Sequence, residues 1–132
     1  MSAFLVVLLA VVGFFIPDHH PDVCLEWGRL TGRLGLSQSE RSQAHDIMWR
    51  ESRCMPTATN PKDPNGGSIG LFQINMFWCK PSRWSSDGWL QSQGVLRSCD
   101  DLYDPEVNVA AFAAIYRYGV DKHGDGWGPW RP

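Results

Sequence analysis

The sequence lacks an excess of charge of either sign. Its 132 residues carry 12 basic and 14 acidic side chains, for a formal net charge of -2, and the basic residues are scattered along the chain. Nucleic-acid binding depends on clustered Lys and Arg that neutralise phosphates. The charge pattern therefore excludes nucleic acid as a first choice of partner.

Metal-binding and redox motifs are also missing. No Cys-x-x-Cys pair occurs, and the four histidines do not have the spacing of metal ligands. A zinc ribbon or a thioredoxin-type motif is therefore excluded as an explanation of the cysteines. We expect no metal and no cofactor.

No apolar run reaches the ~18–20 residues that a membrane-spanning helix needs. The longest runs from Ala3 to Ile16, 14 residues, and Pro17 follows it. Its length suits the apolar core of a secretory signal, although no Lys or Arg precedes it and no Ala-x-Ala pattern follows. We divide the chain into an export or membrane-anchor segment with its linker, residues 1–21, and one folded domain, residues 22–132. A buried first helix and a misassigned start codon are the alternatives.

Four cysteines are present: Cys24, Cys54, Cys79 and Cys99. An even number behind an export-like segment favours two disulfides formed in an oxidising compartment, with four free thiols in a cytosolic protein as the alternative. Of the three pairings, we favour Cys79–Cys99, which closes a loop rich in Trp, Gly and Ser. Cys24–Cys54 then follows by elimination.

Helical patterns dominate the domain. Apolar residues on one helical face from Val23 to Leu34 predict a first helix, and Gly35 supplies its stop. Ser37 and Glu40 have the spacing of a capping box, which predicts a second helix to about residue 52.

The rest of the chain adds one helix and one ambiguous segment. Residues 68–75 are mostly apolar and predict either a short strand or the start of a buried helix. Asp104 and Pro105 predict the start of a further buried helix, and Gly119 is expected to end it. The fold class is therefore mainly α, a small helical domain with a minor β element.

One carboxylate falls on an apolar helix face. Glu51 lies four residues after Ile47 and three after Met48, at the end of the second predicted helix. Burial disfavours a charged carboxylate, so such a position favours the protonated acid that general acid catalysis needs. The alternative is a carboxylate that forms a salt bridge with Arg50 or Arg53.

Two motifs follow in order. Glu51–Ser52 is followed by Gly67–Asn75, which reads GSIGLFQIN, and then by Trp78–Cys79. From about residue 42 to the C-terminus this arrangement resembles the lysozyme superfamily, in particular the soluble lytic transglycosylase and goose-type lysozyme branch. Trp78–Cys79 is also similar to a pair in chicken-type lysozymes, and the helix with Asn108 looks like the family's third motif.

The resemblance implies a lysozyme-like α+β fold and a site that acts on peptidoglycan. Glu51 would be the catalytic acid and base. The segment containing Trp127 would pack over the cleft or form part of its floor. The residues implied to contact the sugars are Ser68, Gln73, Asn75, Asn60, Asn108 and Trp127.

The reaction type depends on a second carboxylate. Chicken-type lysozymes place an aspartate between the matching Ser and Gly, but here only Ile69 stands between Ser68 and Gly70. A single carboxylate suits a lytic transglycosylase that cleaves the MurNAc–GlcNAc bond. A hydrolytic lysozyme with Asp63 or Asp87 as partner carboxylate, and a non-catalytic glycan-binding protein, are the alternatives.

The same resemblance sets the expected partners and location. We expect a monomer that binds peptidoglycan glycan strands. It would act outside the cytoplasm, either secreted or tethered to the membrane at the cell wall, or it would be associated with a phage as an endolysin.

Overall fold

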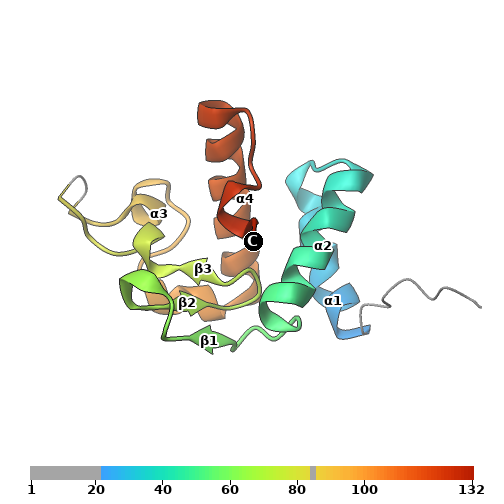
Figure 1. Ribbon diagram of the computed structural model, residues 1–132, viewed down its shortest axis with the longest axis horizontal. Coiled ribbons are helices and arrows are strands. Elements are labelled where there is room, and N and C mark those ends of the chain that lie inside the picture. The colour runs from blue at the N-terminus through green and yellow to red at the C-terminus, as the bar shows by residue number, and fades with distance from the viewer. Residues whose placement is uncertain (1–21, 84–85) are drawn as a thin grey trace, which may run out of the picture.

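The computed structural model describes residues 22–83 and 86–132 (Figure 1). The expected export or anchor segment, residues 1–21, lies outside these ranges. Within the described part of the chain, no helix combines the length and the apolar character needed to cross a membrane.

Helices make up most of the described chain, and they surround one small antiparallel sheet with strand order β1-β2-β3. In Figure 1, α1 and α2 lie together on one side of α4, α3 lies on the other side, and the sheet lies below. The predicted mainly α fold with a minor β element is confirmed. The elements are α1 (Asp22–Thr31), α2 (Gln38–Ser52), β1 (Thr59–Asn60), β2 (Ser68–Ile69), β3 (Ile74–Asn75), α3 (Trp89–Ser92) and α4 (Pro105–His123).

The predicted capping box begins α2. Ser37 Oγ accepts a hydrogen bond from the backbone nitrogen of Glu40 at 3.1 Å, and Glu40 Oε1 accepts one from the backbone nitrogen of Ser37 at 2.9 Å. Two backbone donors that the first helical turn cannot satisfy thus gain partners. Before this, α1 ends at Thr31, a 3-10 turn follows, and Gly35 takes the left-handed conformation with φ 69°.

The predicted end of α4 at Gly119 is wrong, because the helix continues to His123 and Gly124 caps it with φ 69°. Gly119 serves another purpose inside the helix. A Cβ atom there would lie 2.6 Å from the carbonyl oxygen of Asp125 and 3.0 Å from Cα of Gly126. Glycine is required because the returning chain crosses the helix at contact distance.

The ambiguous segment 68–75 is a tight β-hairpin. Ser68 faces Asn75 and Ile69 faces Ile74 in the register of β2 and β3. Between the strands, Gly70 has φ +80°, and a Cβ atom there would lie 2.3 Å from Nδ2 of Asn108. The apolar residues alone could not distinguish this hairpin from a buried helix. The turn depends on the close approach of Gly70 to Asn108 in α4, which the local sequence pattern does not reveal.

The side chain of Asn108 joins α4 to the hairpin from inside the core. Asn108 is fully buried, and its Oδ1 accepts a hydrogen bond from the backbone nitrogen of Phe72 at 2.9 Å. Its Nδ2 donates to the carbonyls of Ile69 and Leu102, both at 2.9 Å. A buried polar group is tolerated only when it is hydrogen-bonded, and here the amide also satisfies three backbone groups that face the core.

Aromatic rings pack around the same turn. Phe72 stacks on Phe112 of α4 with ring centroids 4.0 Å apart, and Trp130 meets Phe112 edge-on at 5.0 Å. The indole nitrogen of Trp130 donates to the carbonyl of Phe72 at 2.9 Å. The C-terminal segment is therefore part of the core.

Both predicted disulfides are confirmed. Cys24–Cys54 joins α1 to the residues after α2, and Cys79–Cys99 closes the loop that contains α3. The Cα atoms of the pairs lie 5.2 Å and 5.3 Å apart. These cross-links restrict the unfolded chain and so stabilise a domain that has little sheet structure.

A hydrogen bond from Tyr116 to Glu40 ties α4 to the first turn of α2. The Tyr116 hydroxyl, followed by the backbone and side chain of Ser37, lowers the pKa of Glu40. Burial, reinforced by the bond to Glu40, raises the pKa of Tyr116 to about 12. Glu40 therefore serves both the capping box and the contact between helices.

We predict that Asn108→Leu destabilises the domain by about 3 kcal/mol or more. Leucine fits the volume roughly but leaves three buried backbone groups without partners, each of which costs about 1–3 kcal/mol. Denaturant unfolding followed by circular dichroism measures the loss. The matched control is Asn60→Ala at an exposed asparagine, for which we expect a change below about 1 kcal/mol. Equal losses in the two variants would contradict the role given to Asn108.

We predict that Tyr116→Phe changes the alkaline limb of the stability curve. Because the pKa of Tyr116 is raised by folding, its contribution is complete below pH 10 and is lost as the pH rises from 10 to about 12. The pKa of Glu40 is lowered, so its contribution is present above 4.5 and is lost as the pH falls below that value. Melting temperatures of the wild type should thus fall more steeply than those of Tyr116→Phe in both directions. Tyr118→Phe, at an exposed tyrosine, should follow the wild type, and three parallel curves would refute the assignment.

Candidate active site

The carboxylate of Glu51 lies in the last turn of α2, as predicted, but it is not enclosed by apolar side chains. Its side chain is 29% exposed, and its Oε1 accepts hydrogen bonds from Nη2 of Arg50 at 3.0 Å and Nε of Arg50 at 3.2 Å. Of the two salt bridges that the sequence left open, the one with Arg50 is formed. The guanidinium of Arg53 instead lies over the ring of Trp49, 4.7 Å from its centroid.

The two sequence motifs meet through the residue next to Glu51. Ser52 is buried, and its Oγ donates to the carbonyl of Leu71 in the hairpin turn at 2.7 Å, with the carbonyl of Met48 at 3.0 Å. The end of α2 is thereby fixed to the turn of the GSIGLFQIN segment. This bond gives Glu51 a defined position beside the hairpin although the two lie about twenty residues apart in the sequence.

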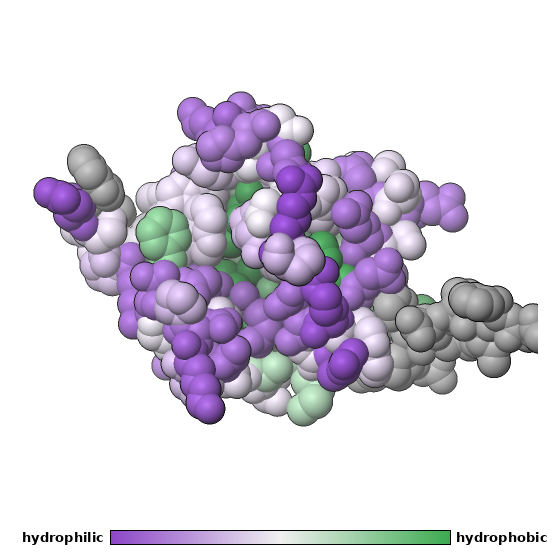
Figure 2. Space-filling view, viewed as in Figure 1, coloured by the Kyte–Doolittle hydropathy of each residue, from purple (hydrophilic) through white to green (hydrophobic). Residues whose placement is uncertain are grey.

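The C-terminal segment forms another side of the site. Arg50 Nη2 donates to the carbonyl of Trp130 as well as to Glu51. Trp127 is partly buried, and its ring lies 4.7 Å from the ring of Tyr116 and 6.0 Å from that of Phe112. Figure 2 shows this face of the molecule, where recessed apolar side chains lie beside the C-terminal segment.

Three of the predicted sugar contacts lie together on the sheet. In the strand register Asn60 faces Ser68, and Ser68 faces Asn75. Asn75 Nδ2 donates to the Pro64 carbonyl at 2.8 Å and lies 3.3 Å from Ser68 Oγ, while Asn60 donates to a carboxylate oxygen of Asp63 at 2.9 Å. Ser68 is only 3% exposed, so its hydroxyl orients Asn75 rather than presenting a free group at the surface.

Gln73 holds the turn with its own side chain. Its backbone has φ 47°, and its Nε2 donates to the carbonyls of Gly70 at 3.0 Å and Ala58 at 3.2 Å. The amide thus connects the hairpin turn to the chain that enters β1. Within the described residues, no hydrogen bond reaches its Oε1.

Asn108 requires a correction. The resemblance implied that it contacts the sugars, but it is fully buried, and its amide oxygen and both amide hydrogens are hydrogen-bonded within the core. Its position on α4 places it behind the hairpin turn. Asn108 therefore supports the site from inside, and it is not a surface on which a glycan could bind.

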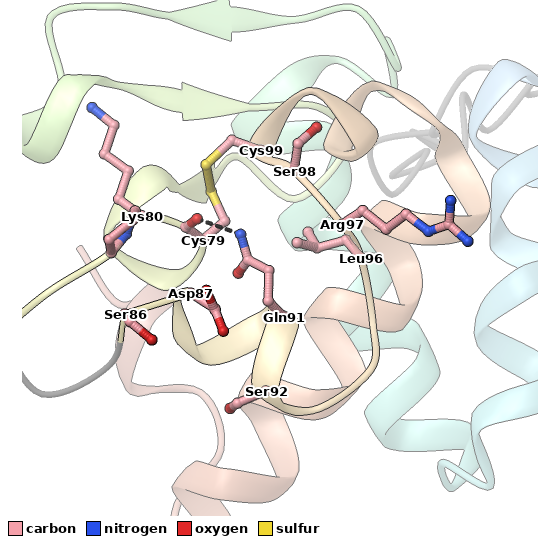
Figure 3. A pocket seen from close by; sticks show the side chains of 11 residues that line it. Cys79, Lys80, Ser86, Asp87, Gln91, Ser92, Leu96, Arg97, Ser98 and Cys99 are labelled. Carbon is pink, nitrogen blue, oxygen red and sulfur yellow. Dashed lines mark hydrogen bonds between the residues drawn. A yellow bond between two sulfur atoms is a disulfide. The ribbon is translucent and has the colours of Figure 1, made fainter.

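A separate pocket lies at the other end of the sheet. It has a volume of about 630 Å³ and surrounds the Cys79–Cys99 disulfide, with Gln91 reaching the Cys79 carbonyl at 2.6 Å (Figure 3). Neither Glu51 nor any of the predicted sugar contacts is among its lining residues. Within residues 22–83 and 86–132, no group of three His, Cys, Asp or Glu side chains is placed to hold a metal ion.

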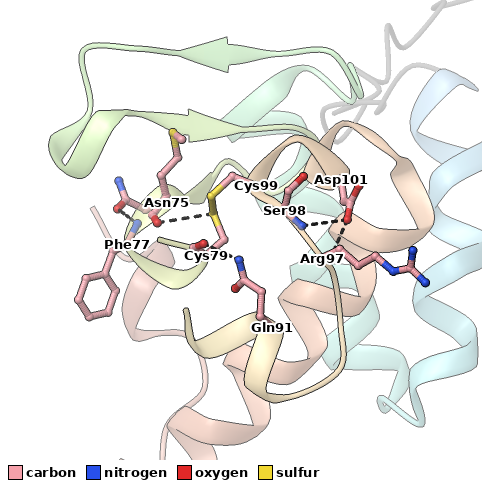
Figure 4. Close-up of a disulfide and its surroundings, with 9 residues drawn as sticks. Asn75, Phe77, Cys79, Gln91, Arg97, Ser98, Cys99 and Asp101 are labelled. Carbon is pink, nitrogen blue, oxygen red and sulfur yellow. Dashed lines mark hydrogen bonds between the residues drawn. A yellow bond between two sulfur atoms is a disulfide. The ribbon is translucent and has the colours of Figure 1, made fainter. Parts of the chain in front are cut away.

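Phe77 was not among the residues predicted from the sequence. Figure 4 shows its ring directed outward beside Asn75, in the segment that the Cys79–Cys99 disulfide fixes. The ring is 56% exposed and meets Trp78 edge-on at 5.3 Å, and the backbone nitrogen of Phe77 donates to Oδ1 of Asn75 at 2.9 Å. Its position in the sequence could have indicated it, because Phe77 is a large aromatic residue only two positions after Asn75, a predicted sugar contact.

Comparison with known proteins agrees with this geometry. The model of a family described as a lysozyme-like domain matches residues 29–131, whereas no curated protein matches the chain. The match covers α2 with Glu51, the hairpin, α4 and the C-terminal segment. Because it extends over most of the sequence, the chain belongs to the lysozyme-like domain family.

Proposed function

We propose that this protein is a peptidoglycan lytic transglycosylase that cleaves the MurNAc–GlcNAc β-1,4 bond with Glu51 as its single acid and base. The observation that carries the proposal is the hydrogen bond from Ser52 to Leu71, which fixes the last turn of α2 against the hairpin in a chain with a lysozyme-like domain. Membership in that family supports peptidoglycan as the substrate.

The hairpin favours transglycosylation over hydrolysis. Glycosidases that use two carboxylates hold them about 5–9.5 Å apart across the bond to be cleaved. Residues 67–75 contain no Asp or Glu, and Ile69 is buried in β2 with 4% exposure. Asp63 is bound by the Asn60 amide, and Asp87 lines the separate pocket beside Cys79–Cys99.

One carboxylate can perform the whole reaction by acting twice. Protonated Glu51 gives its proton to the glycosidic oxygen while the bond from that oxygen to C1 of the MurNAc residue breaks. The C6 hydroxyl of the same sugar then attacks C1 and passes its proton to the Glu51 carboxylate. A 1,6-anhydro ring forms, no water is consumed, and Glu51 regains its protonated state.

Several side chains are suited to hold the glycan in this reaction. Gln73 offers its amide oxygen at the hairpin. Asn75, whose amide is bonded to Asn65, Phe77, Pro64 and Ser68, shapes the adjoining surface, and Asn60 lies at the edge of the sheet. The exposed ring of Phe77 offers a flat apolar face of the kind on which sugar rings stack. Trp127 completes the opposite side, where the C-terminal segment approaches α2.

The same proposal includes the location and state of the protein. Two disulfides favour an oxidising compartment outside the cytoplasm. The apolar residues 3–16 would act as an export signal or as a membrane tether. We propose a monomer that acts at the cell wall, or a phage-associated enzyme that reaches the wall during lysis.

We predict that Glu51→Gln abolishes the clearing of purified cell walls and preserves binding to them. Loss of a general acid lowers the rate by at least about 100-fold, whereas glutamine retains the shape of the side chain. Turbidity loss measures cleavage, and co-sedimentation with sacculi measures binding.

Glu106→Gln is the matched control, because this exposed glutamate lies in the first turn of α4. It should clear walls at the wild-type rate. Clearing by Glu51→Gln within about twofold of wild type would exclude Glu51 as the acid. A wild-type protein that binds walls without clearing them would support the non-catalytic alternative.

A further inference from the structure

Arg50 makes contacts in two directions at the end of α2. Its Nε and Nη2 both donate to Oε1 of Glu51, and Nη2 also donates to the carbonyl of Trp130. Both bonds to the carboxylate therefore fall on one oxygen. Among the described residues, no hydrogen bond reaches Oε2 of Glu51, so this oxygen is the one left to carry and release a proton.

The second contact anchors the guanidinium to the core. Trp130 is buried, its indole nitrogen donates to the carbonyl of Phe72 at 2.9 Å, and the backbone nitrogen of Phe72 is held by Asn108. Arg50 is thus attached at one end to a rigid part of the molecule. An exposed ion pair has little effect when both side chains are free to move, but an anchored guanidinium can fix the direction of its partner.

We propose that Arg50 is a positioning residue for Glu51: it holds Oε1 so that Oε2 faces the substrate. This inference rests on the proposed function. It assigns to the C-terminal segment a part in the reaction, because the Trp130 carbonyl determines where the guanidinium lies.

Other charged groups near this end of the molecule have different partners. Arg53 lies over Trp49, and Arg131 of the C-terminal segment pairs with Asp125 at 2.6 Å. The hairpin, residues 67–75, carries no charged side chain. Arg29 of α1, which also packs against α2, forms no ion pair with Glu51 in the described structure. Arg50 is therefore the cation whose removal should change the orientation of the Glu51 carboxylate.

The test is the cleavage of soluble, uncrosslinked glycan strands by Arg50→Gln and Arg50→Lys, with kcat and KM measured separately. Neither side chain can reproduce the paired bonds to Oε1 together with the bond to the Trp130 carbonyl. In both variants kcat should fall about fivefold or more while KM stays within about twofold of wild type, because the carboxylate loses its fixed direction.

Arg41→Ala, at an exposed arginine in the same helix, is the control and should keep the wild-type kcat and KM. Circular dichroism and melting curves establish that each variant is folded. A kcat of Arg50→Gln within about twofold of wild type, or a loss that appears in KM and leaves kcat unchanged, would overturn the positioning role while leaving the proposed function intact. Absence of cleavage by the wild type, or full cleavage by Glu51→Gln, would instead refute the proposed function itself.

Discussion

The structure depends on a single buried amide. Asn108 of α4 holds the backbone of the hairpin at two points, Ile69 and Phe72, and that of the preceding 3-10 turn at Leu102, and Gly70 leaves the space that this amide occupies. Within the hairpin turn, the Leu71 carbonyl accepts a hydrogen bond from Ser52, and the Phe72 carbonyl accepts one from Trp130. Because α2, the hairpin and the C-terminal segment are all joined at this turn, its geometry fixes the position of Glu51.

In the proposed site the acid, Glu51, lies at the junction of two elements that are distant in sequence. Glu51 is at the end of a helix whose last turn is anchored by Ser52, and its carboxylate is hydrogen-bonded by Arg50. Catalytic groups work best when their rotamers are locked by neighbouring contacts. The C-terminal segment contributes to this arrangement, because the carbonyl of Trp130 accepts a hydrogen bond from the same guanidinium.

Features that depend on neighbouring residues were predicted well from the sequence. The wrong or open predictions concern residues whose roles depend on contacts with distant parts of the chain. The Ser37 capping box and the Cys79–Cys99 loop depend on residues whose spacing is visible in the sequence. Gly119 was wrongly predicted to end the helix. The glycine is needed there because Asp125 and Gly126, which follow the helix cap at Gly124, pack directly against it, and this contact is visible only in the folded chain. The sequence left Arg50 and Arg53 as alternative salt-bridge partners of Glu51. Arg50 is the partner in the folded protein, where its guanidinium also donates to the Trp130 carbonyl of the C-terminal segment. Asn108 was taken for a sugar contact because an asparagine motif does not reveal whether its amide faces a ligand or the core.

In the proposed reaction one carboxylate, Glu51, cleaves the glycan without a second carboxylate and without water. Mass spectrometry of the fragments released from purified sacculi distinguishes this reaction from hydrolysis. We expect the wild type to form muramoyl ends lighter by one water molecule than hydrolytic ends, and Glu51→Gln to form none. Ordinary reducing ends of full mass would contradict single-carboxylate transglycosylation and would instead identify a hydrolytic lysozyme.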